Sequence, residues 1–387
     1  MVVVGAGAFG GWTALHLVRA GVRVTLLDAW GPGNSRSSSG GETRVIRGMY
    51  GADRLYVEWV VRAFEQWREL EASQGMRLYT PTTALWMFQG DDAYARSSLP
   101  LLAEAGLPAR EIPVARAAER FRQIDFSGVG SVFLEEQAGY LAARRACQEV
   151  TRAFVAAGGE YRQAAARPVE GSQGRLATLK LSDGSQLAAD AFVFACGPWL
   201  GELFPEAVGG RIRPTRQEVF FFGTPTGDAR YREESLPTWV DFGDRVLYGI
   251  PGNEERGFKV ADDTHGETVD PTTLERTASQ EALARVRSFL RRRFPDLADA
   301  PLLESRVCQY ETTHDGHLLI DRHPALEDVW LVGGGSGHGY KMGPAVGEHV
   351  AQLVLAEAQP LEKFSLARLR VVEAEAEESQ LRSGGRS

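Results

Sequence analysis

The sequence predicts an α/β protein with two interleaved parts: one built on strand–turn–helix units, and one α+β part built on a mostly antiparallel sheet. Three observations support this. A glycine-rich turn directly follows the first apolar run of the chain. Apolar runs followed by helical patterns recur in the middle and near the end. Aromatic-rich stretches with strand character lie between them.

The first unit spans residues 2–28. "VVV" predicts a short buried strand, "AFGGWTALHLVRAG" has apolar residues at helical spacing, and "VRVTLLD" predicts a second strand. Between them lies G-x-G-x-x-G: Gly5 permits the tight turn, Gly7 lets the backbone approach a pyrophosphate, and Gly10 lets the helix pack on the strand. Asp28 is placed to accept hydrogen bonds from ribose hydroxyls. The unit therefore predicts a Rossmann-like dinucleotide-binding domain, the alternative being a plain glycine-rich turn.

The next segment, "GPGNSRSSSGGETRVIRGMYG", departs from the regular strand–helix alternation of an NAD domain. It is a loop rich in Ser and Gly that leads to two arginines, Arg44 and Arg47. Such composition favours solvated turns, which is one interpretation. The functional interpretation is a loop along an extended dinucleotide, with both arginines near its reactive end. The glycine motif alone does not separate NAD from FAD.

Later segments supply more elements of the first part. Residues 141–157 have helical periodicity and end at a glycine, and "GPAVGEHVAQLVLAEA" predicts another helix. "AFVFAC" and "DVWLVGGG" predict buried strands. The Asp183-Gly184 pair predicts a hairpin turn.

The second part contains a predicted helix over residues 53–73, whose Trp-rich face is more typical of a core than of a cofactor site. "LWMFQG", "EVFFFG" and "RVLYGIPG" predict strands of its sheet. The predicted division is a dinucleotide-binding domain over residues 1–52, 140–215 and 305–370, a substrate domain over 53–139 and 216–304, and a polar tail over 371–387.

Composition disfavours several classes of partner. The net charge of −8 argues against nucleic acid or an anionic membrane surface. The chain has no run of about 20 apolar residues, so no membrane span is predicted. Three cysteines at wide spacing make a disulfide scaffold improbable and predict a reducing compartment, hence a cytoplasmic location.

Three other kinds of site are disfavoured. "GGGSGHGYK" is not a phosphate loop, because Met342 stands where Ser or Thr would bind magnesium. His314, His317 and His323 lack a helix that would align them as ligands, so no metal is predicted. The absence of G-x-S-x-G disfavours a hydrolase.

Six segments carry a more specific signal: "GAGAFG" with Asp28, "GGETRVIRGMYG", "FACGPW", "GFK", "VCQYETTHDGHLLID" and "GSGHGYKMGPAVGE". In order and spacing they resemble the monomeric sarcosine oxidase and N-methyltryptophan oxidase family, within the D-amino-acid-oxidase-like flavoproteins. The resemblance covers nearly the whole chain, although the chain begins at the first predicted strand and lacks leading residues of the usual pattern. It implies FAD as cofactor, a small amino-acid substrate, molecular oxygen as electron acceptor and a monomer.

The resemblance also implies a role for the lone Cys308. In this family the cysteine of a C-x-Y-T-like segment forms a thioether with the 8α-methyl group of the flavin, and Cys308 matches it, with Tyr310 two residues on. That methyl group is acidic enough to give an electrophilic quinone methide, which a thiolate near basic groups can attack. Arg306 is close in sequence. The alternative is a small buried core residue, the commonest fate of an unpaired cysteine.

Further roles are implied residue by residue. Lys259 matches the lysine that helps reduced flavin react with oxygen, and Arg44 the arginine that lies against the flavin ring. Arg47 and Lys341 match the residues that bind the substrate carboxylate. The other catalytic candidates are His338 and Tyr310, and the other substrate-binding candidate is Tyr248. Further cofactor-binding candidates are Thr43, Val169, Cys196, Gly197, Trp199, Gly337, Gly339 and Tyr340.

One departure concerns specificity. Sarcosine-specific relatives have a histidine four residues after the oxygen-activating lysine, whereas this chain has Asp263 there and its nearest histidine is His265. Strict sarcosine specificity is therefore not predicted. The function expected is an FAD-dependent oxidase of secondary, N-methyl amino acids that yields an imine and hydrogen peroxide. The alternatives are a dehydrogenase of a related amine or cyclic imino acid that passes electrons to a carrier, and a flavin-bearing module without activity.

Overall fold

The computed structural model describes residues 1–169 and 174–369. The predicted polar tail, residues 371–387, lies outside the described residues. Within the described ranges, no helix combines the length and the apolar character that a membrane span needs.

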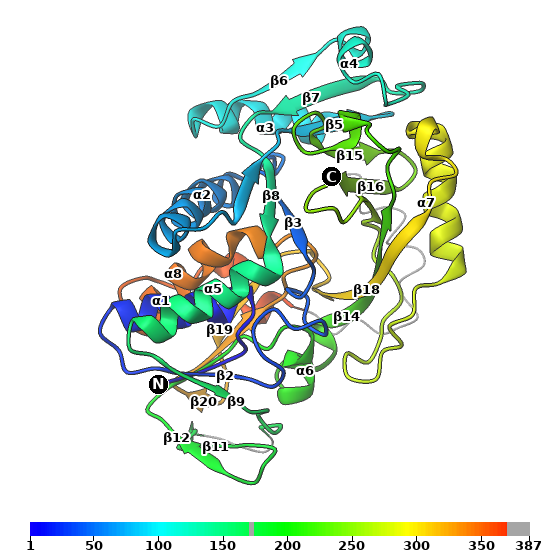
Figure 1. Ribbon diagram of the computed structural model, residues 1–387. Helices are drawn as coiled ribbons and strands as arrows, with labels where there is room; N and C mark the ends of the chain where they lie inside the picture. The colour runs from blue at the N-terminus through cyan, green and yellow to red at the C-terminus, as the bar shows by residue number, and fades with distance from the viewer. Residues whose placement is uncertain (170–173, 370–387) are drawn as a thin grey trace.

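A six-stranded sheet forms the base of the first part (Figure 1). The central strand β1 (Val2–Val4) is parallel to β2 (Thr25–Asp28) on one side and to β13 (Phe192–Phe194) on the other. Outside these lie β9 (Glu160–Gln163), β21 (Val329–Gly333) and the antiparallel edge strand β19 (Leu319–Arg322). Strands from the start, middle and end of the chain thus meet in one sheet, as the sequence predicts.

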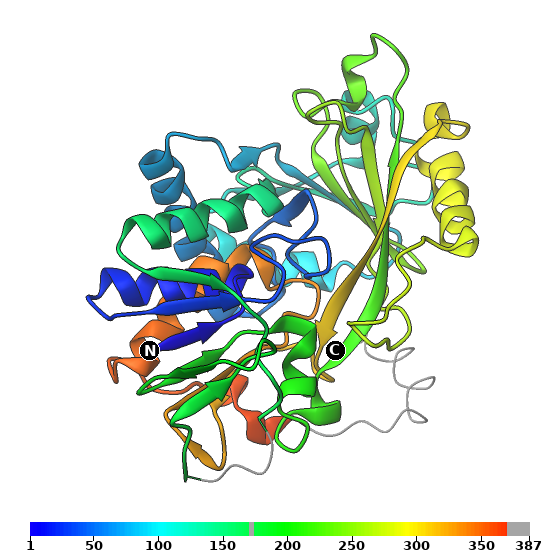
Figure 2. The same ribbon diagram turned by 60° about the horizontal axis from the view of Figure 1, so that its bottom comes forward.

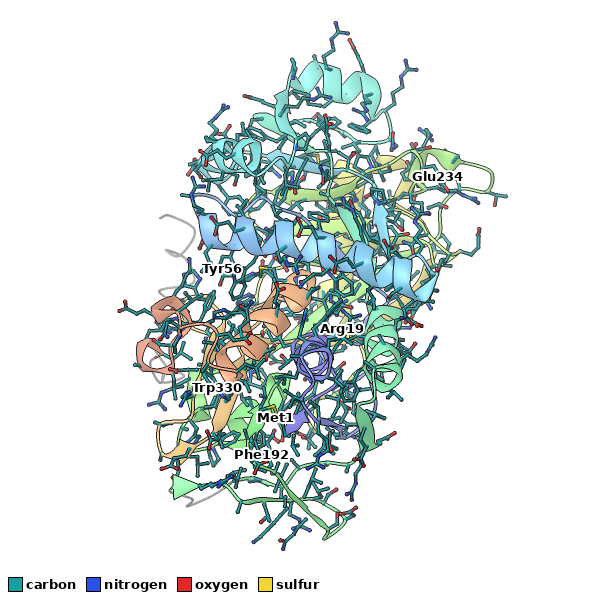
Figure 3. All side chains as sticks on the ribbon, turned by 90° about the vertical axis from the view of Figure 1, so that its left-hand side faces the viewer. Met1, Arg19, Tyr56, Phe192, Glu234 and Trp330 are labelled. Carbon is teal, nitrogen blue, oxygen red and sulfur yellow. The ribbon has the colours of Figure 1, made fainter. Side chains whose placement is uncertain are left out.

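Three helices pack together beside this sheet. Helix α1 (Ala8–Arg19) lies against β1 and contacts α5 (Ala143–Ala156) and α8 (Gly343–Val354). In Figure 3, α2 (Arg54–Gln74) runs across the molecule above α1 and α8. The Asp53 carboxylate caps α2 by accepting from the Tyr56 N–H, and Gly75 ends it in the left-handed conformation.

An eight-stranded sheet forms the second part. Its order is β18 (Leu302–Thr312), β14 (Arg213–Phe222), β17 (Phe258–Asp262), β16 (Val246–Ile250), β15 (Thr238–Phe242), β5 (Ala84–Phe88), β7 (Ser131–Glu135) and β6 (Ala109–Ile112). All neighbouring pairs are antiparallel except β15 and β5. Helix α7 (Gln280–Arg293), capped by Ser279, covers this sheet through Phe289, which stacks on Trp239. The mostly antiparallel second sheet is therefore confirmed.

The two longest strands connect the two parts. Strands β14 and β18 pair along their length and run side by side through the molecule, green and gold in Figure 2. A three-stranded sheet of β3 (Thr43–Ile46), β8 (Gly139–Ala142) and β4 (Tyr79–Pro81) lies near them. Two predicted domain boundaries, near residues 215 and 305, fall inside β14 and β18, and the domain division stays a prediction.

The Asp183-Gly184 turn joins two antiparallel strands, as predicted. The remaining α-helices and β-strands are β10 (Gly174–Arg175), β11 (Thr178–Lys180), β12 (Gln186–Ala188), β20 (Leu326–Glu327), α3 (Ala93–Glu104), α4 (Val114–Arg120) and α6 (Leu200–Leu203).

Candidate active site

The glycine turn between β1 and α1 opens onto a cavity of about 240 Å³, called here the cofactor cavity. Gly5 has a φ of +104°, and a Cβ there would lie 2.2 Å from the Ala195 carbonyl oxygen. A Cβ on Gly10 would lie 1.9 Å from the Gly5 carbonyl oxygen, so the helix packs this closely only with glycine. Gly5 and Gly7 line the cavity, whereas Gly10 supports the turn from behind.

Asp28 ends β2 at the wall of the same cavity. Its carboxylate accepts three backbone hydrogen bonds, from Ala6 at 2.8 Å, Trp30 at 2.9 Å and Gly31 at 2.8 Å. Burial raises the pKa of this carboxyl group, and the three N–H donors oppose that shift. The acid is therefore fixed in place beside the glycine turn.

A second cavity of about 390 Å³, called here the substrate cavity, lies next to the first. Arg44, Tyr310, Gly337 and Tyr340 line both cavities, so the two meet at these residues. The substrate cavity has largely aromatic walls, which include Tyr50, Tyr56, Trp86, Tyr94, Phe242 and Tyr248. Such walls lower the local dielectric constant around the charged groups that also line the cavity.

Two cations face the substrate cavity without a carboxylate partner. Arg47 lies over the ring of Tyr50 at 4.4 Å and over that of Trp86 at 5.4 Å. Lys341, 4% exposed, donates to Tyr50 Oη at 2.8 Å and to the His338 carbonyl at 2.6 Å. Burial, and then the nearby Arg47, lowers the pKa of Lys341 well below its usual value. Among residues 1–169 and 174–369, no acid lies within ion-pair distance of either cation, and an anionic ligand would stabilise both.

His338 is neutral and extends this hydrogen-bonded chain. Burial, and then Lys341, lowers its pKa to about 3. Its Nε2 lies 2.8 Å from the carbonyl oxygen of Gly316, which can only accept, so Nε2 carries the proton. Nδ1 then accepts from Tyr50 Oη at 3.2 Å. Lys341 thus donates to Tyr50, and Tyr50 donates to His338.

Lys259 is buried behind Arg44 and lines neither cavity. Its Nζ donates to the Thr43 carbonyl at 3.0 Å and lies 5.7 Å from the ring of Tyr248. Burial, and then Arg44, lowers its pKa to about 7. A negative charge that develops nearby would stabilise the protonated form of this lysine, and the protonated lysine would stabilise that charge in turn.

Cys308 lies on β18 against Arg44. Its Sγ is 3.5 Å from a guanidinium nitrogen of Arg44, and it is half-buried. Arg306 points elsewhere, to Glu42 at 2.8 Å. The basic neighbour of the thiol is therefore Arg44, which sequence proximity alone did not suggest. All three cysteines are free.

The other cofactor-binding candidates differ in position. Cys196, Gly197, Trp199, Gly337, Gly339 and Tyr340 line the cofactor cavity. Thr43 is buried and bonds Lys259 instead. Val169 lines neither cavity: its N–H donates to Leu203 at 2.9 Å, while its neighbour Pro168 faces the cofactor cavity.

Glu311 is a site residue that sequence reasoning missed. It is buried on β18, it lines the cofactor cavity, and its Oε2 has no hydrogen-bond partner among the described residues. Burial raises its pKa to about 7. The available signal was the glutamate in the segment that resembles C-x-Y-T, where the threonine would stand.

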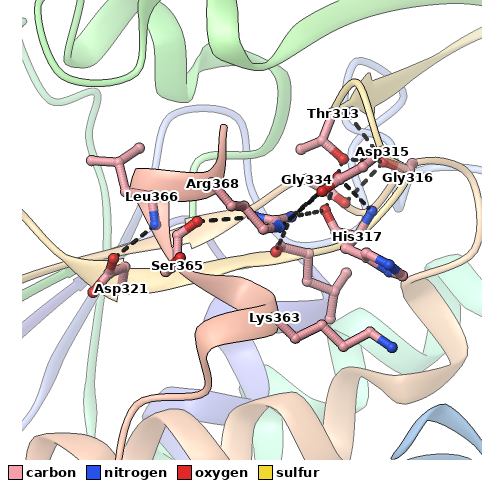
Figure 4. Close-up of polar contacts among 12 residues, drawn as sticks. Thr313, Asp315, Gly316, His317, Asp321, Gly334, Lys363, Ser365, Leu366 and Arg368 are labelled. Carbon is pink, nitrogen blue, oxygen red and sulfur yellow. Dashed lines mark hydrogen bonds and ion pairs between the residues drawn. The ribbon is translucent and has the colours of Figure 1, made fainter. Parts of the chain in front are cut away.

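A hydrogen-bonded cluster holds one rim of the substrate cavity (Figure 4). Arg368 donates to the His317 carbonyl at 2.8 Å and pairs with Asp315 at 3.0 Å. Tyr56 Oη lies 3.1 Å from the ring nitrogen Nδ1 of His317. Asp315, Gly316 and His317 line the cavity, and no group of three or more potential metal ligands was found in the described part of the chain.

Comparisons with known proteins find similar sequences and a similar fold over most of the chain. A family model described as DAO, FAD dependent oxidoreductase, matches residues 1–353. Monomeric sarcosine oxidase of Bacillus sp. (strain NS-129) is 30% identical over 364 residues, which cover 91% of this chain and 92% of that protein. N-methyl-L-tryptophan oxidase of Yersinia pestis (strain Pestoides F) is 27% identical, covering 96% and 99%. The crystal structure of L-proline dehydrogenase from P. horikoshii shares the fold, with a TM-score of 0.81 at 22% identity and coverage of 95% and 96%.

Proposed function

The chain belongs to the DAO family of FAD-dependent oxidoreductases, and on this premise we propose that it oxidises N-methyl amino acids, with oxygen as electron acceptor and hydrogen peroxide as product. The observation that carries the proposal is the pair of cations, Arg47 and Lys341, that lacks an acidic partner in a cavity next to the cofactor cavity. Relatives named sarcosine oxidase and N-methyl-L-tryptophan oxidase support the substrate class.

FAD fits the cofactor cavity on features of this chain. The turn at Gly5 and Gly7 leaves the backbone open to a pyrophosphate, and Asp28 is held where a ribose would lie. The unpartnered Oε2 of Glu311 offers a buried hydrogen-bonding group to the same ligand. Cys308, beside Arg44, would attach the cofactor covalently. When bound, FAD would accept a hydride from the substrate and pass the two electrons on to oxygen.

The substrate carboxylate binds Arg47 and Lys341. The guanidinium is fixed by two aromatic rings and the ammonium by Tyr50, so both cations are oriented before the ligand arrives. The carboxylate meets two buried cations that have no acidic partner in the described part of the chain, and this attraction is strong because the walls are largely aromatic. The rest of the substrate then lies toward Tyr310, at the junction of the two cavities.

Lys259 serves the oxygen step in this proposal. Its ammonium is buried near Arg44 and Cys308, so it presents a fixed positive charge close to the predicted attachment point of the cofactor. Such a preorganised charge stabilises a developing anion without reorganisation. The proposal includes a monomer, supported by the relatives named monomeric sarcosine oxidase, and a cytoplasmic location, for which the free cysteines remain the argument.

A panel of amines tests the proposal. Sarcosine, larger N-methyl amino acids, proline-like rings and the same amines without a carboxylate are incubated with the holoenzyme, in air and without oxygen. N-methyl amino acids should bleach the flavin without oxygen and yield peroxide in air. Bleaching without peroxide would favour the dehydrogenase alternative, and no bleaching by any of these amines would overturn the proposal.

A further inference from the structure

One acid of the substrate cavity, Asp263, has no role so far. Asp263 follows β17 and lines the same cavity as Arg47 and Lys341. Its Oδ1 accepts a 2.8 Å hydrogen bond from Tyr310 Oη. Its Oδ2 has no hydrogen-bond partner, and Asp263 has no ion pair, among the residues that the structure describes.

The neighbouring acid, Asp262, has partners on both of its carboxylate oxygens. Asp262 pairs with Arg245 at 2.5 Å and lies 4.0 Å from Arg285, and its other oxygen accepts from the Thr264 N–H at 3.0 Å. Asp262 is thus satisfied by the fold. Asp263 is satisfied only on the oxygen that faces Tyr310.

A carboxylate in this environment favours a cationic ligand. Burial raises the pKa of Asp263, and Tyr310, His265, Arg47 and Lys341 offset that shift in decreasing order. Tyr310 donates to Asp263 Oδ1, but His265, Arg47 and Lys341 form no ion pair with it among the described residues. The ring of His265 packs against Tyr310 at 5.8 Å instead. A cation at Oδ2 would stabilise the ionised carboxylate, and the aromatic walls strengthen this attraction by lowering the local dielectric constant.

We propose that Asp263 binds the cationic nitrogen of the substrate, so that the cavity selects zwitterions. The carboxylate of the ligand lies on Arg47 and Lys341, and its ammonium group lies on Asp263 Oδ2. Since Tyr310 lines both cavities and bonds Asp263, this places the nitrogen at the junction with the cofactor cavity. The inference rests on the proposed function and adds the residue that recognises the amine.

Two ligands of equal shape test this without turnover. Trimethylglycine and 3,3-dimethylbutanoate carry the same carboxylate, and a quaternary nitrogen in the first replaces a carbon in the second. Neither has the N–H or nitrogen lone pair of a substrate amine. Each is titrated into the holoenzyme, and binding is followed by the visible spectrum of the flavin. The wild-type chain should bind trimethylglycine about tenfold more tightly or better, as expected for one partly buried charge pair.

Asp263→Asn should remove that preference, because the amide keeps the shape and still accepts from Tyr310 but has no charge. Asp262→Asn is the matched control, since Asp262 pairs with Arg245 and does not line the cavity, and it should keep the wild-type ratio. Tyr310→Phe should also keep a preference for the zwitterion, because the carboxylate remains.

The outcomes separate this inference from the proposed function. If Asp263→Asn keeps the full preference for trimethylglycine, the aromatic rings select the cation and the inference is wrong. Equal binding of both ligands by the wild-type chain, weakened in Arg47→Ala, would likewise overturn the role of Asp263 while leaving the carboxylate site intact. If Arg47→Ala weakens neither ligand, the carboxylate site itself is wrong.

Discussion

Lys341 Nζ donates a 2.8 Å hydrogen bond to Tyr50 Oη, so this buried cation is held by a phenol and not by a carboxylate. Arg47 lies over the ring of the same tyrosine. The two segments are almost 300 residues apart in the chain, and one aromatic side chain organises both cations. This arrangement keeps the positive charge available to a ligand, which an internal salt bridge would not do.

Arg47→Ala should remove most of the preference for substrates with a carboxylate. Losing one partner of a buried charge pair typically costs about 2–5 kcal/mol. The free energy of the transition state for N-methyl amino acids should rise by that amount, and kcat/KM should fall accordingly. Their decarboxylated counterparts should be little affected. Arg68→Ala, on the exposed side of α2, is the control and should leave the ratio unchanged. Equal turnover of acids and simple amines by the wild-type enzyme would contradict the carboxylate site.

Cys308→Ser should lose the covalent bond to the flavin while FAD can still bind at the glycine turn. The measurement is the yellow colour or fluorescence of the chain on a gel after acid denaturation. Cys196→Ser is the control, because Cys196 lines the cofactor cavity and contacts the Val4 carbonyl. A wild-type chain from which acid releases all the flavin would show that Cys308 is not an attachment point.

Lys259→Met should slow reoxidation of the flavin by orders of magnitude, since one preorganised charge is worth about 3–4 kcal/mol. Anaerobic reduction by substrate should change far less. Because burial lowers the pKa of Lys259 to about 7, its protonated fraction falls as pH rises through 7, and wild-type reoxidation should slow over that range. The variant should show no such fall. Lys180→Met, at an exposed lysine, serves as the control, and equal slowing of both half-reactions in Lys259→Met would refute the role.

Glu311→Gln should change how stability depends on pH. Burial raises the pKa of Glu311 from 4.5 to about 7, so between these values the unfolded chain has lost a proton that the folded chain retains. Stability of the wild-type chain should therefore fall as pH rises from about 4.5 to 7, through this group alone by about 3 kcal/mol. The difference in unfolding free energy between Glu311→Gln and wild type, measured at several pH values, should grow across this window and be constant above it. A difference independent of pH would exclude a protonated Glu311.

Asp241→Asn should destabilise the eight-stranded sheet, because Arg293 would keep its charge with no acid beside it. The pair is 2.6 Å long, with side-chain exposures of 0% for Arg293 and 1% for Asp241. Removing one partner of such a pair costs about 3–5 kcal/mol. Asp296→Asn is the comparison, since its pair with Arg230 is exposed and should contribute at most about 1 kcal/mol. The check is the midpoint of chemical denaturation, and equal effects of the two variants would be contrary to this expectation.

Local chemistry made much of the fold predictable. The turn from Gly5 to Gly10 needs residues without a Cβ, and the spacing of apolar residues marks α1, α2, α5 and α8 within a few residues of their observed ends. The hairpin at Asp183 and Gly184 follows from turn preferences alone. Each of these signals lies within a short stretch of sequence, and the family resemblance added the expected roles of individual residues.

The contacts within the site were decided by the tertiary structure. Cys308 meets Arg44 across 264 residues of sequence, whereas the nearer Arg306 pairs with Glu42. Tyr310 reaches Asp263 because β18 and β17 flank β14 on opposite sides. The physical reason is that strand register and burial choose which distant side chains meet and which polar atoms lose water. No local pattern encodes either quantity. The sequence therefore determined the elements and, through the family resemblance, their expected chemistry, whereas the packing of distant strands determined the electrostatics of the site.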